Sequence, residues 1–185
     1  MSKIPIIQSE RALITILNTE DSPLVHDYFL RNKAHLEPWD PIRTEEFYSE
    51  EAWRKRLELA QNDCRDGRAL HFYALNSNRD EILGRCSYSN IVRGPFQACH
   101  LGYSLDEKQQ GQGLMVEILE ATLDYIFTVL NLHRVMANYI PRNLKSARVL
   151  EKLGFEKEGL AKSYLKIAGR WEDHVLTSKI NSKHS

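Results

Sequence analysis

A helical stripe of apolar side chains is the clearest pattern in this chain. It runs between Leu114 and Leu130, where apolar side chains recur at steps of three and four residues. The stripe consists of Met115, Ile118, Leu119, Thr122, Tyr125, Ile126 and Val129. This period places them on one face of an α-helix. We therefore expect a long amphipathic helix that buries this face in the core.

Three strand-like runs precede this helix, at residues 70–75, 82–92 and 96–105. Short connections rich in Asn, Asp, Gly and Pro separate them, which is typical of antiparallel hairpins. A further strand is expected at residues 134–140. Because a strand reached through a helical crossover runs parallel to its neighbour, we expect one parallel pair in an otherwise antiparallel sheet.

The flanking segments complete a mixed α/β or α+β fold, which we expect to form a single domain over residues 1–185. Two prolines at positions 38 and 41 indicate that residues 35–41 form an interhelical loop, which carries Trp39. The remaining expected elements are a strand at 11–17, helices at 22–31, 51–66 and 143–153, and a closing strand pair at 155–164 and 171–179.

The composition is that of an ordinary globular protein. Of 185 residues, 42% are hydrophobic and 27% charged, with 25 basic and 25 acidic side chains. The hydrophobic and charged fractions exclude the disordered and collagen-like classes of protein. The equal numbers of basic and acidic side chains give no global attraction for nucleic acid or an anionic membrane. Any partner must be recognised locally.

Cysteine and histidine usage gives no sign of a metal site or a disulfide framework. Three cysteines without Cys-x-x-Cys spacing favour reduced thiols, and no two of the seven histidines have metal-ligand spacing.

Residues 1–10 lack a signal-peptide pattern, and no apolar run approaches the roughly 20 residues of a membrane span. We expect a soluble cytoplasmic protein without a metal cofactor.

A glycine-rich turn joins the last hairpin strand to the long helix. Its sequence is Lys108-Gln109-Gln110-Gly111-Gln112-Gly113. Such a turn presents backbone N–H groups at the positive end of a helix dipole, which favours an anionic ligand such as a pyrophosphate. A Walker loop would need Gly-Lys-Ser/Thr here, and a dinucleotide fingerprint would need a small residue in place of Val116. Neither pattern fits, which counts against nucleotide hydrolysis and NAD chemistry.

The turn instead resembles the acyl-CoA loop of the GCN5-related N-acetyltransferases (GNAT), Arg/Gln-x-x-Gly-x-Gly/Ala, with Lys108 as a departure. A second segment is similar to another signature of that family: Asn143 and Ser146 followed by Leu150-Glu151-Lys152-Leu153-Gly154-Phe155. Asn would cap this helix and Gly would end it. The resemblance covers residues 12–180 and implies the GNAT fold, a mostly antiparallel twisted sheet with helices on both faces.

The resemblance also implies that acetyl-CoA is the cosubstrate. The residues that would bind it are Tyr103, Ser104, Leu105, Lys108, Gln109, Gln110, Gly111, Gln112, Gly113, Leu114, Asn143 and Ser146. Residues 89–104, 36–39 and 171–173, with Tyr164, resemble the ribosomal-protein-alanine N-acetyltransferase branch, especially those members that act on small-subunit ribosomal protein number five. This implies a ribosomal protein N-terminus as acceptor, with the assembling small ribosomal subunit as a further partner and no membrane or DNA partner.

In this family the amine attacks the thioester directly, through a tetrahedral oxyanion. An α-amino group has a pKa of about 7.7 to 8.0, against about 10.4 for lysine, so it needs less help from a base. We expect a backbone N–H within residues 103–105, at the family's bulged strand, to stabilise the oxyanion, since preorganised donors contribute about 3 to 4 kcal/mol each.

The acid and base of some ribosomal acetyltransferases are absent, because Asn138 and Leu150 occupy their positions. Ser146 is the nearest replacement acid, although an exposed first-turn role explains it equally well. The base is expected to be a water chain held by Asn138 or His100, and a structural role for His100 stays open. Trp39 and Tyr103 are candidates for binding the acceptor, with packing at the sheet edge as the alternative for Trp39.

Two other functions remain open. One is acetylation of a small amine, which would call for an acidic acceptor pocket. The other is a ribosome-assembly factor that keeps the acetyl-CoA fold for binding, which would call for a concentrated basic face. The basic residues at 54–56 and at 142, 145 and 148 lie on separate helices among acids, which favours solvated helix faces.

Overall fold

One twisted sheet organises the chain, of which the computed structural model describes residues 4–183. The strand order is β1-β2-β3-β4-β5-β6-β8-β7. The bounds are β1 Ile6–Gln8, β2 Leu13–Thr15, β3 Leu70–Leu75, β4 Ile82–Val92, β5 Ala98–Leu105, β6 Arg134–Met136, β7 Glu156–Ile167 and β8 Arg170–Ile180. β5 pairs with β6 in parallel and the other neighbours described are antiparallel. The predicted parallel pair is confirmed.

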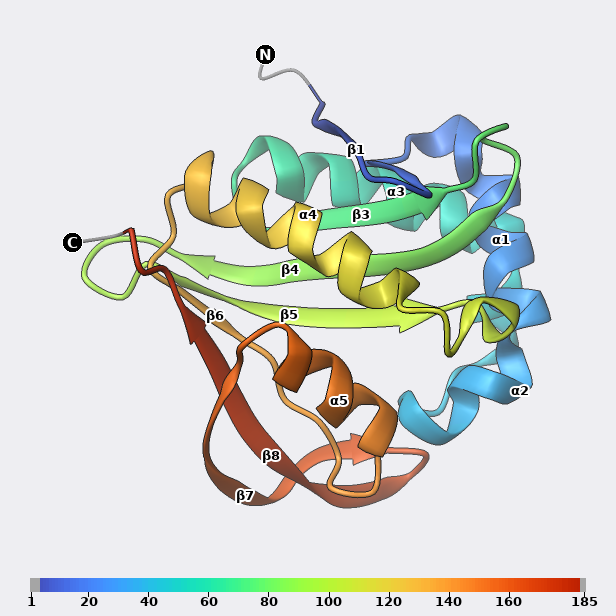
Figure 1. Cartoon of the computed structure of the whole chain (residues 1–185). Helices are drawn as coiled ribbons and strands as arrows, with labels where there is room; N and C mark the ends of the chain where they lie inside the picture. The colour runs from blue at the N-terminus through green and yellow to red at the C-terminus, as the bar shows by residue number, and fades with distance from the viewer. Residues whose placement is uncertain (1–3, 184–185) are drawn as a thin grey trace.

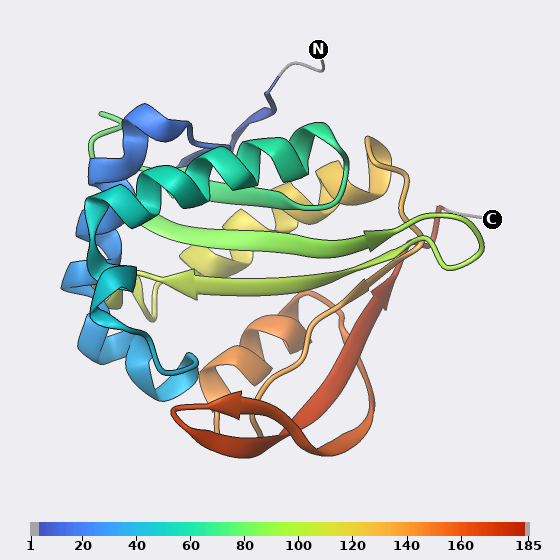
Figure 2. The same ribbon diagram turned by 180° about the vertical axis from the view of Figure 1, so that it is seen from behind.

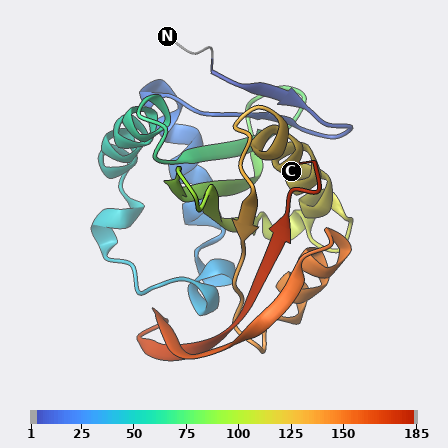
Figure 3. The same ribbon diagram turned by 90° about the vertical axis from the view of Figure 1, so that its left-hand side faces the viewer.

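Helices cover both faces of this sheet, as predicted. The helices are α1 Ser22–Arg31, α2 Lys33–Leu36, α3 Glu50–Arg65, α4 Leu114–Thr128 and α5 Leu144–Lys152, with 3-10 turns η1 Thr19–Asp21, η2 Glu37–Trp39, η3 Glu45–Tyr48 and η4 Glu107–Gln109. α4 and α5 lie on the face seen in Figure 1, and α1 and α3 lie on the opposite face, seen in Figure 2. Figure 3 shows the sheet between these two layers.

The α4 stripe packs into the core as the periodicity predicts. Ile118, Leu119 and Ile126 are fully buried against the sheet. The buried hydroxyl of Thr122 donates to the carbonyl of Ile118 and bonds to Tyr88, so this polar member is satisfied. The prediction that Val129 belongs to the buried stripe is wrong, because α4 ends at Thr128 and Val129 is 61% exposed.

A second core lies on the other face, beneath α1 and α3. Phe29 of α1 stacks on Trp53 of α3 with ring centroids 4.3 Å apart, and Phe47 packs edge-on against both rings. Leu57 and Val25 are fully buried in the same cluster. These aromatic contacts fix α1, whose last turn reaches the site described below.

Three predicted boundaries were wrong. The strand expected at 11–17 is shorter, β2 at Leu13–Thr15, and it forms a hairpin with β1 at Ile6–Gln8, a strand that was not predicted. Residues 35–41 are largely helical, because Pro38 lies in the first turn of η2, where its missing N–H is not needed. The strand expected at 134–140 ends at Met136, where β6 leaves β5.

This departure of β6 opens the sheet at its centre. The β5–β6 pairing covers only Ala98↔Arg134 to His100↔Met136. β5 continues to Leu105, whereas β6 and β8 diverge from it, with α5 beside the opening (Figure 1). Among the residues that the structure describes, no strand therefore pairs with the second half of β5 on that side.

Candidate active site

The glycine-rich turn has the backbone geometry of an anion cradle. Gly111 and Gly113 both have φ = +77°, in the left-handed region that L side chains disfavour. Gly113 is the N-cap residue of α4. A Cβ added at either glycine would meet nothing within 4 Å, so the space above the turn is open to a ligand.

The backbone N–H groups of residues 108–113 are not all free, and the part predicted for these residues in binding the cofactor stays a prediction. The Lys108 amide donates to the Asp106 carboxylate, and the amides of Gln109 and Gln110 donate to carbonyls within the η4 turn. Within residues 4–183, the amides of residues 111–113 donate to no other residue. These amides lie at the positive end of α4, where an anion is stabilised.

Side chains from three other parts of the chain bond to this turn. Gln110 bonds His35 of α2 at 2.7 Å and accepts from Lys145 of α5 at 2.6 Å. The guanidinium of Arg11 donates to the carbonyl of Gln112 and forms an ion pair with Glu117 of α4. The turn is thus held by elements on both sides of the opening.

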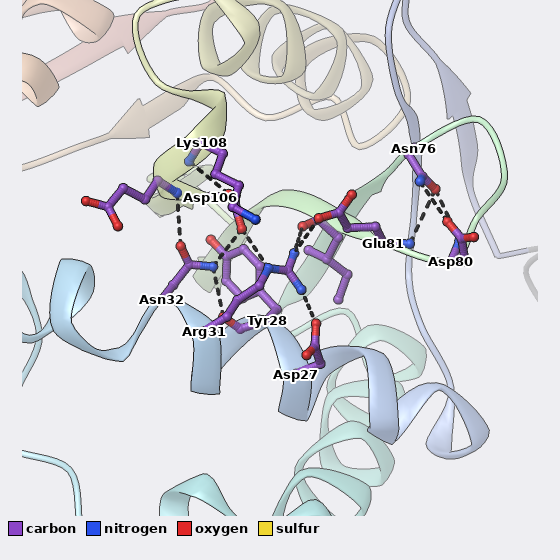
Figure 4. Close-up of polar contacts among 11 residues, drawn as sticks. Asp27, Tyr28, Arg31, Asn32, Asn76, Asp80, Glu81, Asp106 and Lys108 are labelled. Carbon is purple, nitrogen blue, oxygen red and sulfur yellow. Dashed lines mark hydrogen bonds and ion pairs between the residues drawn. The ribbon is translucent and has the colours of Figure 1, made fainter.

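A buried carboxylate, which sequence reasoning missed, anchors the start of the turn (Figure 4). The Asp106 side chain, 3% exposed, accepts from Arg31 Nε at 2.8 Å, Asn32 Nδ2 at 2.9 Å and the Lys108 amide at 2.9 Å. The side-chain Oδ1 of Asn32 also accepts from the Glu107 amide. Burial raises the pKa of Asp106, but these hydrogen bonds outweigh it and the pKa lies below its usual value.

We expect Asp106→Ala to lower the free energy of unfolding by about 3 kcal/mol, because it leaves buried donors without their acceptor. Since the folded pKa is depressed, the stabilisation is present above the unfolded pKa of about 3.9 and is lost as pH falls through the folded pKa. Urea unfolding at pH 7 and pH 3 measures both effects. Asp66→Ala, which removes an exposed ion pair with Arg68, is the control, and equal losses would contradict the anchoring role.

Backbone groups of β5 face the opening. The Asp106 amide donates to the Leu83 carbonyl on β4, so strand alternation turns the Tyr103 and Leu105 amides toward the opposite edge. The predicted bulge is wrong here, because the β4–β5 register runs unbroken from Leu105 to His100. The divergence of β6 creates the opening instead.

Tyr103 and Ser146 meet across this opening. Their hydroxyl oxygens are 2.7 Å apart, and Tyr103 also donates to the Ser146 carbonyl at 3.2 Å. Asn143 caps α5 by accepting from the Ser146 amide, and Gly154 ends the helix segment at φ = +75°, both as predicted. Burial raises the pKa of Tyr103 well above its usual value, so the phenol stays protonated at neutral pH.

The two candidate base residues differ in their surroundings. The Asn138 amide is engaged at both ends, by Tyr164 Oη at 3.3 Å and the Thr177 amide at 3.4 Å. His100 Nδ1 is buried and has no hydrogen-bond partner within residues 4–183, and burial lowers the pKa of the imidazole. A neutral imidazole can accept a proton and an amide cannot, so side-chain chemistry favours His100 over Asn138 as the predicted base.

Trp39 is less free than the sequence suggested. The Arg142 guanidinium lies 5.6 Å from its ring centroid and forms an ion pair with Glu172 of β8 at 2.8 Å. Trp39 therefore belongs to a contact that joins η2, the segment before α5, and β8. Its part in binding the acceptor stays a prediction.

The comparisons with known proteins agree with this geometry. The profile of the acetyltransferase (GNAT) domain matches residues 11–156. The [ribosomal protein uS5]-alanine N-acetyltransferase of Escherichia coli is 41% identical over 179 residues, covering 96% of this chain and 92% of that enzyme. No helix within residues 4–183 is long and apolar enough to cross a membrane.

Two solved structures extend this similarity to the whole fold. A ribosomal-protein-S5-alanine acetyltransferase from Vibrio fischeri is 45% identical with a TM-score of 0.94, covering 98% of this chain and 99% of that chain. Mycobacterium smegmatis RimJ, solved in complex with CoA-disulfide, is 26% identical with a TM-score of 0.88, covering 97% and 88%. The family predicted from the glycine-rich turn and the Asn143 segment is confirmed: this chain belongs to the GNAT acetyltransferase family.

Proposed function

We propose that the protein transfers the acetyl group of acetyl-CoA to the α-amino group of the N-terminal alanine of ribosomal protein uS5. The observation that carries this proposal is the Gly111–Gly113 cradle beside an open edge of β5, in a chain that matches an enzyme of that activity over nearly its whole length. Acetyl-CoA supplies the acetyl group as an activated thioester.

The residues present fit this cosubstrate. The amides of residues 111–113 would hold the pyrophosphate, because they have no partner in the described chain and no side chain fills the space above them. Tyr103, Ser146 and Asn143 are joined by hydrogen bonds beside the opening next to β5. The amide of Tyr103 or Leu105 would donate to the thioester oxygen as negative charge develops on it.

His100 would accept the proton that the amine loses. We expect kcat/KM of the wild type to decrease in two steps as the pH falls. The first step, near pH 8, reflects protonation of the acceptor amine. The second, below pH about 6.5, reflects protonation of His100, because burial lowers its pKa. His100→Ala should remove the lower limb and keep the upper one. A pH–rate profile measures both, and an unchanged lower limb would exclude His100.

The setting we propose is the bacterial cytoplasm, where the acceptor chain would be modified before or during assembly of the small ribosomal subunit. DNA and membrane are not proposed partners. The basic residues of α3 support an enzyme over an RNA-binding assembly factor, because Arg54 and Lys55 pair with Glu50 and Glu51 and Arg56 lies over the Trp53 ring. They form no concentrated basic face.

Release of free coenzyme A tests the proposal against its alternatives. The acceptors are a peptide with the N-terminal sequence of uS5, the same peptide with a blocked N-terminus, and spermidine. We expect thiol release only with the free peptide. Release with spermidine alone would support small-amine acetylation, and acetyl-CoA binding without release would support the assembly-factor alternative.

A further inference from the structure

The glycine at position 102 lies at an exposed point in the middle of the central strand β5. Gly102 is exposed, although its strand neighbours Leu101 and Tyr103 are buried or half-buried. A Cβ added to it would meet nothing within 4 Å. Its φ is outside the left-handed region, so backbone conformation does not require glycine here. Packing and conformation therefore leave this glycine unexplained.

A second strand glycine shows what a packing requirement looks like. A Cβ at Gly84 of β4 would lie 2.9 Å from Leu105 Cδ1 and 3.1 Å from the Ser104 carbonyl oxygen. Gly84 is thus needed for close packing, whereas Gly102 faces open space. A glycine inside a strand without such a neighbour often marks a point where a ligand approaches the backbone.

Gly102 lies on the face of the sheet opposite α4 and α5. Ser104, two residues further on, bonds Tyr28 of α1 at 2.9 Å, so Gly102 and His100 share that face. Figure 2 shows the middle of β5 from this side, between α3 and the β7–β8 hairpin. The next residue, Tyr103, turns its amide to the opening.

The surroundings of Gly102 are small and polar. Its cross-strand neighbour on β4 is Ser87, which is buried and bonds to both Arg85 Nη2 and His71 Nδ1 at 3.0 Å. On the other side lies the opening left by β6. His100, whose Nδ1 lacks a partner, is two residues away on the same face. A small group placed over Gly102 would thus lie between the polar side chain of Ser87 and the candidate base His100.

We propose that Gly102 is the floor of the subsite for the first residue of the acceptor. The inference rests on the proposed function. The N-terminal residue lies flat over Gly102 with its α-amino group toward His100, and the missing side chain at position 102 leaves room for the methyl group of alanine. Acceptors are therefore selected for a small first residue by the size of position 102.

Substitution at position 102 tests this subsite through acceptor preference. We compare kcat/KM for two peptides that differ only in an N-terminal alanine or glycine, using wild type, Gly102→Ala and Gly102→Val. We expect Gly102→Ala to shift the alanine-to-glycine ratio about tenfold toward glycine, since one methyl group in a pocket is worth that much. Gly102→Val should raise KM for both peptides and leave acetyl-CoA affinity unchanged.

Gly159→Ala and Gly159→Val are the matched controls, because Gly159 is also an exposed strand glycine with nothing within 4 Å of an added Cβ. They should leave the ratio unchanged. An unchanged ratio in both Gly102 variants, with wild-type turnover of both peptides, would overturn the subsite alone. A wild type that acetylates neither peptide would overturn the proposed function and the subsite with it.

Discussion

Replacing Gly113 by alanine should raise KM for acetyl-CoA about 100-fold and leave kcat with saturating cosubstrate nearly unchanged. At φ = +77° an alanine is strained by roughly 1 to 2 kcal/mol, and relief of that strain turns the neighbouring amides away from the anion. Loss of two charge-assisted hydrogen bonds of about 1.5 kcal/mol each corresponds to about two orders of magnitude. Initial rates over a range of acetyl-CoA concentrations measure the effect.

The control must carry the same backbone strain elsewhere. Gly94, in the exposed β4–β5 connection, has φ = +70° and nothing within 4 Å of an added Cβ. Gly94→Ala should lower the free energy of unfolding by a similar amount without changing KM. If both variants showed the same KM, Gly113 would be a structural glycine and the cradle assignment would be wrong.

The second large effect is expected at the pair formed by Tyr103 and Ser146. We propose that the Ser146 hydroxyl donates to the departing sulfur while Tyr103, which stays protonated, turns its O–H from the Ser146 carbonyl to Ser146 Oγ. Because general acids contribute about 10²-fold or more, Ser146→Ala and Tyr103→Phe should each lower kcat by about that factor. KM for acetyl-CoA should change much less.

The double variant distinguishes this relay from two separate contributions. If the two hydroxyls act as one unit, the double variant should be no slower than the slower single variant. Multiplied losses would contradict the relay. A wild-type kcat and pH profile in Ser146→Ala would remove Ser146 from the mechanism.

The sequence revealed those parts of the site that depend on local backbone conformation. Gly111, Gly113 and Gly154 adopt the left-handed geometry that glycine permits, and Asn143 caps the helix that follows it. Such features are encoded within a few residues, so spacing alone identifies them. The hairpins of β3, β4 and β5 follow from short turns in the same way.

Features that depend on distant residues were missed. Arg31 and Asn32 lie 75 and 74 residues from Asp106, and nothing in their local sequence indicates that they meet. Their carboxylate partner also accepts a hydrogen bond from the Lys108 amide. The opening beside β5 arises because the chain beyond Met136 keeps its contacts with β8, through Ala137 and Tyr139, and leaves β5; strand propensity does not contain this tertiary preference.

The most direct test of the central claim is tandem mass spectrometry of unacetylated ribosomal protein uS5 after incubation with this protein and acetyl-CoA. We expect the mass gain of one acetyl group, located on the α-amino group of the N-terminal alanine, and a strong reduction of that product with Gly113→Ala at low acetyl-CoA. An acetyl group found only on lysine side chains, or none at all with acetyl-CoA bound, would contradict it.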